Sequence, residues 1–151
     1  MAQQNAEARA STQGILAGRL PAEGPGIELT VYSPSGTIKA STLFNILEEL
    51  RNAGAEAIQL GERRITASSY IVDTAGGVIV DGTVLTAPYT YLAIGDTQKM
   101  SLALEIPGGA LAAVHALGGS ASVTPGTKIT IDATRAASAP QYATPRPVDK
   151  P

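Results

Sequence analysis

Residues 41–58 constrain the fold more than any other stretch, because they predict a helix that leads almost directly into a strand. Apolar side chains recur here at spacings of three and four residues, which is typical of one buried face on a helix. These residues are Leu43, Ile46, Leu47 and Leu50. Ser41 or Thr42 is expected to cap the start of the helix, and Gly54 to end it in the left-handed conformation. A strand at 56–60 follows at once.

Strand and helix patterns surround this stretch on both sides. The other predicted elements are strands at 27–32, 89–94, 122–123 and 128–131 and helical turns at 96–104 and 108–117. Pro125 and Gly126 are expected to form a turn between the last two strands. In chain order these elements predict an α+β fold, a ferredoxin-like split βαβ sandwich (βαββαβ) with its helices on one face of a mainly antiparallel sheet. Its buried residues should include Leu47, Leu50, Leu92 and Ile94.

A β-hairpin insertion is predicted between the second and third core strands, within residues 61–88, where a strand at 70–74 and a turn at 75–77 are also expected. Asp81 and Gly82, between apolar runs at 78–80 and 83–85, give the strongest short hairpin signal in the chain. A small hairpin cannot bury all of its apolar residues, so we expect a partner surface here. The residues assigned to this surface are Arg63, Arg64, Ile65, Tyr70, Val78 and Val84. The adjacent arginines fit either a solvated turn or a surface for an anionic partner.

The chain divides into three predicted regions. Residues 1–15 are polar and alanine-rich, and they tolerate a helix that would be marginal alone in water. Residues 16–132 are expected to form a single α+β domain. From 133 to 151, Ala, Pro, Ser and Thr dominate without periodicity, so this tail is predicted to be disordered.

Composition argues against several classes of partner and site. There are 11 basic and 13 acidic residues without a basic cluster, so no nucleic-acid partner is predicted. The sequence has no cysteine, which removes disulfides, thiolate zinc sites and cysteine nucleophiles together. No apolar run reaches the roughly 18 residues that a membrane span needs.

No catalytic residue, metal site or cofactor is predicted from the sequence. His115 is the only histidine, and no carboxylate lies within a helical turn of it, so a packing or surface role is favoured over catalysis. Asp73, Asp81 and Asp96 lie in turns, where aspartate is expected to bond its own local backbone. Glu56 begins a strand, and either a structural ion pair with Arg63 or Arg64 or plain solvation is expected.

One feature of the chain is a series of short segments in a fixed order, at 23–26, 53–58, 64–66, 80–82, 88–89, 93–96 and 107–109. Taken together, these segments resemble the bacterial domain of unknown function (DUF) family 881 of actinobacteria and Firmicutes, and the resemblance covers Leu16 to Asp132. The sequence departs from the family at two positions. Gly61 and Glu62 follow the second strand, where the family usually has Asn-Gly, and Val72 stands where the family often has an arginine. An anion site shared with the family at that position is therefore in doubt.

The resemblance implies a location and a role, but no reaction. Members of the family look like membrane-anchored proteins in which a transmembrane helix and a coiled coil precede an extracytoplasmic domain, so residues 1–15 would be the end of a coiled coil. The implied setting is the cell envelope or cell division, with a membrane contact only through an anchor that is absent from this chain. We expect a non-enzymatic interaction module that binds a protein partner or a second copy of itself. The alternatives are a small-ligand regulatory domain, by analogy with ferredoxin-like folds, and an unrecognised hydrolase.

Overall fold

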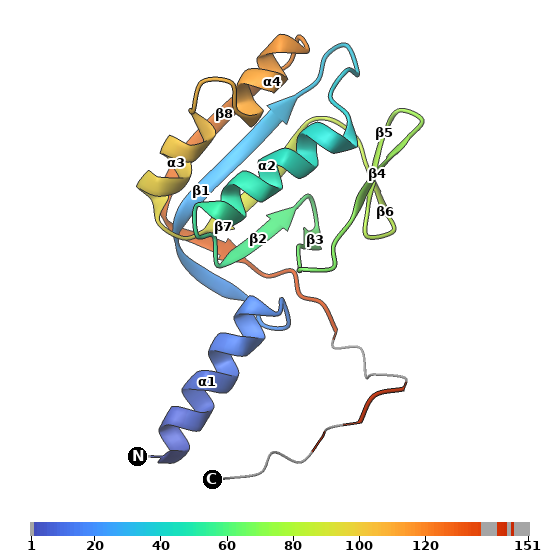
Figure 1. The fold of residues 1–151 in the computed structure, drawn as a ribbon. Coiled ribbons are helices and arrows are strands. Elements are labelled where there is room, and N and C mark those ends of the chain that lie inside the picture. Colours follow the sequence, from blue (N-terminus) through green and yellow to red (C-terminus); the bar gives the residue numbers. More distant parts are fainter. Residues whose placement is uncertain (1, 137–141, 145, 147–151) are drawn as a thin grey trace.

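The computed structural model describes residues 2–136, 142–144 and 146 of the 151-residue chain. Its helices are α1 (Ala2–Leu16), α2 (Ala40–Asn52), α3 (Thr97–Leu104) and α4 (Ala110–Ala116). Its strands are β1 (Ala22–Tyr32), β2 (Ala57–Leu60), β3 (Arg63–Arg64), β4 (Ile71–Thr74), β5 (Gly77–Val80), β6 (Thr83–Leu85), β7 (Tyr89–Ile94) and β8 (Ser120–Ile131). Figure 1 shows α1 projecting away from the rest of the domain.

The main sheet of the described residues has five strands in the order β3-β2-β7-β1-β8. Every neighbouring pair is antiparallel. Helix α2 connects β1 to β2, helices α3 and α4 connect β7 to β8, and all three helices cover the same face of the sheet (Figure 1). The predicted α+β class with a mainly antiparallel sheet is therefore confirmed.

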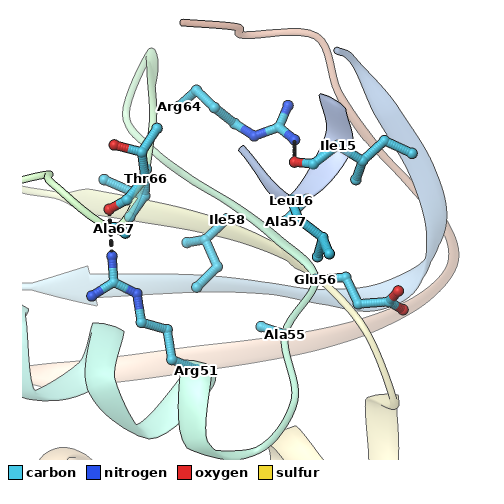
Figure 2. Close-up of a pocket in the computed structure, with 11 residues that line it drawn as sticks. Ile15, Leu16, Arg51, Ala55, Glu56, Ala57, Ile58, Arg64, Thr66 and Ala67 are labelled. Carbon is cyan, nitrogen blue, oxygen red and sulfur yellow. Dashed lines mark hydrogen bonds between the residues drawn. The ribbon is translucent and has the colours of Figure 1, made fainter. Parts of the chain in front are cut away.

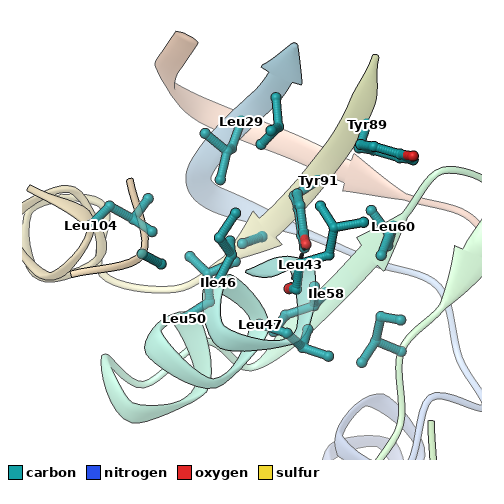
Figure 3. Close-up of a cluster of buried hydrophobic side chains, with 14 of the residues drawn as sticks. Leu29, Leu43, Ile46, Leu47, Leu50, Ile58, Leu60, Tyr89, Tyr91 and Leu104 are labelled. Atoms are coloured by element: carbon teal, nitrogen blue, oxygen red, sulfur yellow. Dashed lines mark hydrogen bonds between the residues drawn. The ribbon is translucent and has the colours of Figure 1, made fainter. Parts of the chain in front are cut away.

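The core lies between this sheet and its helices. All four residues of the predicted apolar stripe on α2 are completely buried, including Leu47 and Leu50. They meet side chains from alternate positions of the central strands, among them Leu29 and Tyr91 (Figure 3). Alternation places Leu92 and Ile94 on the opposite face of β7, where Ile94 is buried and Leu92 is half-buried in a smaller second cluster.

The predicted cap of α2 is wrong, whereas its predicted end is right. The helix begins at Ala40, ahead of Ser41 and Thr42, and Lys39 is its N-cap residue. The amide of Ala40 donates 2.8 Å to Oδ1 of Asp73, so the cap comes from a strand 33 residues away. Gly54 follows the helix with a φ of 91°, the left-handed conformation that glycine adopts without strain.

The predicted strands of the insertion are present, but they form a sheet of their own rather than a hairpin alone. Strand β3 extends the edge of the main sheet, and β4, β5 and β6 form a separate three-stranded antiparallel sheet within the described residues. The predicted hairpin is its β5–β6 arm, where Asp81 and Gly82 have φ values of 48° and 87°. Two successive positive φ values are the signature of the type I′ turn that Asp-Gly favours. Strand β4 joins as a third strand because its register with β5 is continuous from Ile71 to Thr74.

Strand β8 is one continuous strand, so the predicted turn at Pro125 and Gly126 is wrong. Pro125 pairs opposite Ile27, and the register shifts between Gly24 and Gly26 of β1. Between these pairs, Thr127 and Lys128 of β8 stand opposite the single residue Pro25 of β1, so a β-bulge on β8 absorbs the irregularity. Because β8 is an edge strand, a proline there removes no hydrogen bond from a further neighbour.

The two ends of the described chain behave differently. The described side chains of α1 between positions 6 and 13 are exposed, and contact with the domain begins at Gly14 and Ile15. Residues 133–136, which fall in the predicted disordered tail, follow β8, and two of them bond to other parts of the domain. Most of the predicted tail, 137–141, 145 and 147–151, lies outside the described residues.

Candidate functional site

The predicted partner surface separates into a buried and an exposed group. Arg64, Ile65 and Val78 are 1%, 6% and 0% exposed, so their assignment to a surface is wrong. Val78 is buried because side chains alternate between the two faces of a strand, and Val78 and Val80 of β5 both point toward the core. The exposed residues of the set are Tyr70 and Val84, at 49% and 59%, while Arg63 is half-buried.

An apolar stripe crosses the outer face of the insertion sheet. Val72 of β4 pairs with Ile79 of β5, and Ile79 pairs with Val84 of β6, so the three side chains lie side by side on one face. Val72 is 45% exposed and Ile79 is half-buried. Tyr70 lies two residues before Val72 and shares its face. We call these four residues, Tyr70, Val72, Ile79 and Val84, the outer stripe.

The inner face of the insertion sheet fastens it to the core. Asp73 accepts the amide of Ala40 at the start of α2, and Val78 is completely buried. At the β5–β6 turn, Oδ1 of Asp81 accepts the amide of Tyr70 at 3.0 Å, and its backbone oxygen accepts Nη2 of Arg63 at 3.2 Å. The outer stripe is therefore carried on a sheet that is anchored at both ends.

Carboxylates cap the three helices of the core. Asp96 accepts the amide of Lys99 at 3.0 Å and caps α3 locally, as predicted. Asp73 caps α2, and Oε1 of Glu49 accepts the amide of Ala110 at 2.8 Å at the start of α4. The expectation that Asp73 and Asp81 bond their own local backbone is wrong, because their carboxylates bind Ala40, Tyr70 and Arg135 in other segments. A negative charge at a helix N-terminus is stabilised by the helix dipole.

Arg64 joins three separate segments of the chain. Its Nη1 donates to the backbone oxygens of Leu20 at 2.7 Å and Ala133 at 3.0 Å, and its Nη2 donates to that of Ile15 at 2.7 Å. The Ile15 carbonyl lies at the C-terminal end of α1, where the helix dipole favours a cation. Burial lowers the pKa of the Arg64 guanidinium from its usual value. Within the described part of the chain no carboxylate forms a salt bridge with Arg64, so carbonyl oxygens alone surround this charge.

The ion pair considered between Glu56 and Arg63 or Arg64 does not form among the described residues. Figure 2 shows the Glu56 carboxylate directed away from the Arg64 guanidinium. Both residues line a cavity of about 180 Å³, together with Arg51, whose Nη2 donates 2.6 Å to the Thr66 backbone oxygen. A cavity of this size is smaller than the usual pocket for a small-molecule ligand.

A larger hollow of about 530 Å³ lies between α2 and α3. It is mostly apolar, and it is lined by Ala53, Lys99, Leu102 and Ile106 among others. Leu102 and Ile106 are 60% and 57% exposed. The hollow is broad enough for a small ligand or a side chain of a partner, and among the described residues that line it Glu49 is the acid and none is a histidine.

The titratable groups of the domain are structural in their contacts. The Tyr91 hydroxyl donates 2.6 Å to the Leu43 backbone oxygen, and burial, followed by the neighbouring Tyr89, raises its pKa well above the usual value. Burial and then Asp73 raise the pKa of Tyr89. His115 is exposed at the end of α4. No group of three or more His, Asp or Glu side chains that could hold a metal ion occurs within the described residues.

Among the helices that the structure describes, none combines the length and the apolar character needed to cross a membrane. The fold and its surfaces thus define a small α+β domain with an anchored, outward-facing inserted sheet. The chain belongs to the family described as bacterial protein of unknown function (DUF881), whose sequence model matches residues 9–144.

Relatives from two bacteria support this membership. The chain is 36% identical over 146 residues to the UPF0749 protein Rv1825 of Mycobacterium tuberculosis, covering 94% of the chain and 50% of that protein. It is 34% identical over 102 residues to the UPF0749 protein YlxW of Bacillus subtilis, covering 61% of the chain and 44% of that protein. The chain thus spans about half the length of the curated relatives it matches.

A solved structure has the same fold. It is the crystal structure of an uncharacterized conserved protein from Mycobacterium tuberculosis, which aligns with a TM-score of 0.84 at 35% identity. The alignment covers 91% of this chain and 99% of that one, so the inserted sheet and the main sheet belong to one shared architecture.

Proposed function

We propose that this chain is a non-enzymatic interaction domain that binds a protein partner through the outer stripe. The observation that carries the proposal is the register of Val72, Ile79 and Val84, which aligns three β-branched side chains across an exposed sheet face. Tyr70 extends this face with an aromatic ring, a side chain that is enriched at protein interfaces. Exposed apolar patches on anchored elements are typical of interaction sites.

The proposed setting is the extracytoplasmic side of the cell membrane. The resemblance to a family whose members look membrane-anchored supports this location. An envelope-associated or division-associated role follows from the same resemblance. The element order and strand order also support a ferredoxin-like arrangement, in which strands β2, β7, β1 and β8 are the four core strands.

Photocrosslinking in the bacterium that encodes this protein tests the proposed surface. A photoreactive phenylalanine analogue replaces Tyr70 in the full-length protein, and a matched variant carries it at the exposed Ser122 of β8. We expect a discrete protein adduct from position 70, and loss of that adduct when Val84→Lys is added. A charge in the centre of the stripe opposes burial against an apolar partner.

The adduct's composition distinguishes the two kinds of partner. An adduct of twice the mass of the full-length protein identifies a second copy of that protein. Mass spectrometry of an adduct of any other mass identifies a different protein. Equal crosslinking from positions 70 and 122, or an adduct that is insensitive to Val84→Lys, would refute the outer stripe as the binding surface. Circular dichroism of the Val84→Lys variant should match the unmodified protein, because the residue is 59% exposed.

A small-ligand regulatory role is the second candidate. It is supported by the apolar hollow between α2 and α3, whose volume of about 530 Å³ lies in the range of small-molecule sites. A thermal-shift screen with metabolites and amphiphiles tests it. A stabilising ligand whose effect disappears in Ile106→Asp, while the melting temperature without ligand stays unchanged, would favour this role.

A further inference from the structure

Three segments that are far apart in the sequence meet around two arginines at the base of α1. Arg64 binds the end of α1 at Ile15, the following loop at Leu20 and the segment after β8 at Ala133. Two residues further on, the Arg135 amide donates 2.7 Å to the Gly18 backbone oxygen. The segment 133–135 therefore lies against both the loop that follows α1 and the guanidinium of Arg64.

The same segment reaches the inserted sheet. Nη1 of Arg135 lies 2.6 Å from Oδ2 of Asp81, and the Asp81 side chain is only 2% exposed. Asp81 also holds the amide of Tyr70, the first residue of the outer stripe. A charged hydrogen bond that is shielded from water is stronger than an exposed pair, so this contact is a firm attachment.

Helix α1 has few other contacts that could set its direction. Among the described side chains of the helix, those from position 6 to 13 are exposed, and packing begins at Ile15 in its last turn, which contacts the cluster of Ala57, Ile94 and Ile131. Gly18 has a φ of 80°, and a Cβ there would lie 2.9 Å from Thr66 and 3.2 Å from Arg64. The loop after α1 therefore fits closely against Arg64, and the bonds to Ile15 and Gly18 hold the end of the helix in place.

We propose that residues 133–135 form a strap that couples the direction of α1 to the position of the inserted sheet, with Arg64 and Arg135 as its two fasteners. With the strap attached, the helix and the sheet move as one unit. With the strap detached, α1 pivots at Gly18 and its direction becomes independent of the sheet. The coupling goes beyond the proposed function, since it needs no partner on the outer stripe.

The chemistry of arginine suits this role. A guanidinium presents several donors in a planar fork, so Arg64 serves three carbonyl oxygens at once. A lysine ammonium keeps the charge, but its compact geometry cannot reproduce this fork. Arg135 is partly exposed, with a side-chain exposure of 29%, so its replacement leaves the core intact.

Distance measurements between two spin labels test the coupling. The sequence contains no cysteine, so Ser11→Cys on α1 and Ala75→Cys at the β4–β5 turn give a uniquely labelled pair at two exposed positions. Glu48→Cys on α2 with Ser122→Cys on β8 gives a control pair within the core. Pulsed electron–electron double resonance then reports the distance distribution of each pair.

We expect one narrow distance peak for the 11–75 pair in the otherwise unchanged protein. Truncation after Asp132 should replace that peak with a broad distribution while the control pair stays unchanged, and Arg135→Ala, which removes only the contact with Asp81, should broaden the peak to a smaller extent. Arg64→Lys should broaden it as well, and Arg135→Lys should restore part of the narrow peak because the charge pair with Asp81 survives.

Two results would overturn the strap. One is a broad 11–75 distribution before any strap residue is changed, because α1 would then have no fixed direction. The other is a narrow peak that persists in both Arg135→Ala and the truncated chain. The chain truncated after Asp132 is the decisive variant if Arg64→Lys fails to fold, and the control pair reports folding in every case.

Discussion

Replacing Asp73 with alanine should destabilise the domain although the residue is exposed and lies outside the main sheet. Oδ1 of Asp73 accepts the Ala40 amide at 2.8 Å and is the distant cap of α2. Loss of an N-terminal cap costs about 0.5–2 kcal/mol. The lost interaction between charge and helix dipole adds about 0.3–1 kcal/mol, and the lower part of that range applies because Asp73 is solvent-accessible. We therefore expect a loss of about 1–2 kcal/mol in the free energy of unfolding.

Urea unfolding followed by circular dichroism measures this loss, and two variants separate its parts. Asp73→Asn keeps an acceptor and removes the charge, so it should lose only the dipole part. Asp96→Ala removes the local cap of α3 and is the matched control. Hydrogen exchange should rise at both α2 and β4 in Asp73→Ala, but at α3 alone in Asp96→Ala. An unchanged urea midpoint in Asp73→Ala, or exchange that rises at α2 without β4, would refute the distant cap.

Two further predictions concern the centre of the main sheet. Tyr91→Phe should cost about 0.5–1.5 kcal/mol, because it removes the hydrogen bond to the Leu43 oxygen. Burial raises the pKa of the Tyr91 hydroxyl in the folded protein, so the unfolded chain loses the hydroxyl proton first as the pH rises past 10.0. The free energy of unfolding should therefore fall with rising pH, by up to about 1.4 kcal/mol per pH unit. Unfolding titrations should show a shallower alkaline decline in Tyr91→Phe, and an identical decline would contradict this assignment. Gly26→Ala should destabilise by at least about 1–3 kcal/mol, because its Cβ would lie 1.9 Å from the Ala93 oxygen. Gly24→Ala, whose added carbon would meet the flexible Ile94 side chain at 3.2 Å and no backbone atom within 4 Å, is the control, and equal thermal shifts for the two would disprove the steric argument.

Local patterns predicted the elements well. The stripe on α2, the bounds of β7 and the Asp81–Gly82 turn all depend on residues that are close in sequence, and each is confirmed. Side-chain periodicity and turn preference act over a few residues, so one sequence contains the whole signal. The predicted break in β8 is wrong because the rule that proline ends a strand applies to central strands, and β8 lies at an edge.

Contacts between distant residues had no such signal. Asp73 and Asp81 look like ordinary turn residues, yet the first caps a helix 33 residues away and the second binds Arg135 across 54 residues. The sequence predicts that Arg63 and Arg64 lie on a partner surface, but Arg64 is buried and joins three segments of the chain. The sequence indicates Tyr70 and Val84 of the outer stripe but not Val72 and Ile79. These two residues are seen to lie beside Val84 only when the register of β4, β5 and β6 is known.

The proline in β8 has a consequence for how this protein behaves when concentrated. A long edge strand presents unpaired amides and carbonyls, which makes it a template for strand-to-strand aggregation. Pro125 has no amide hydrogen, and it interrupts this row near the middle of Ser120–Ile131. Lys128 adds a charge to the second half of the same edge. Pro125, which is unusual within a strand, therefore hinders the edge strand of one molecule from pairing with an edge strand of another.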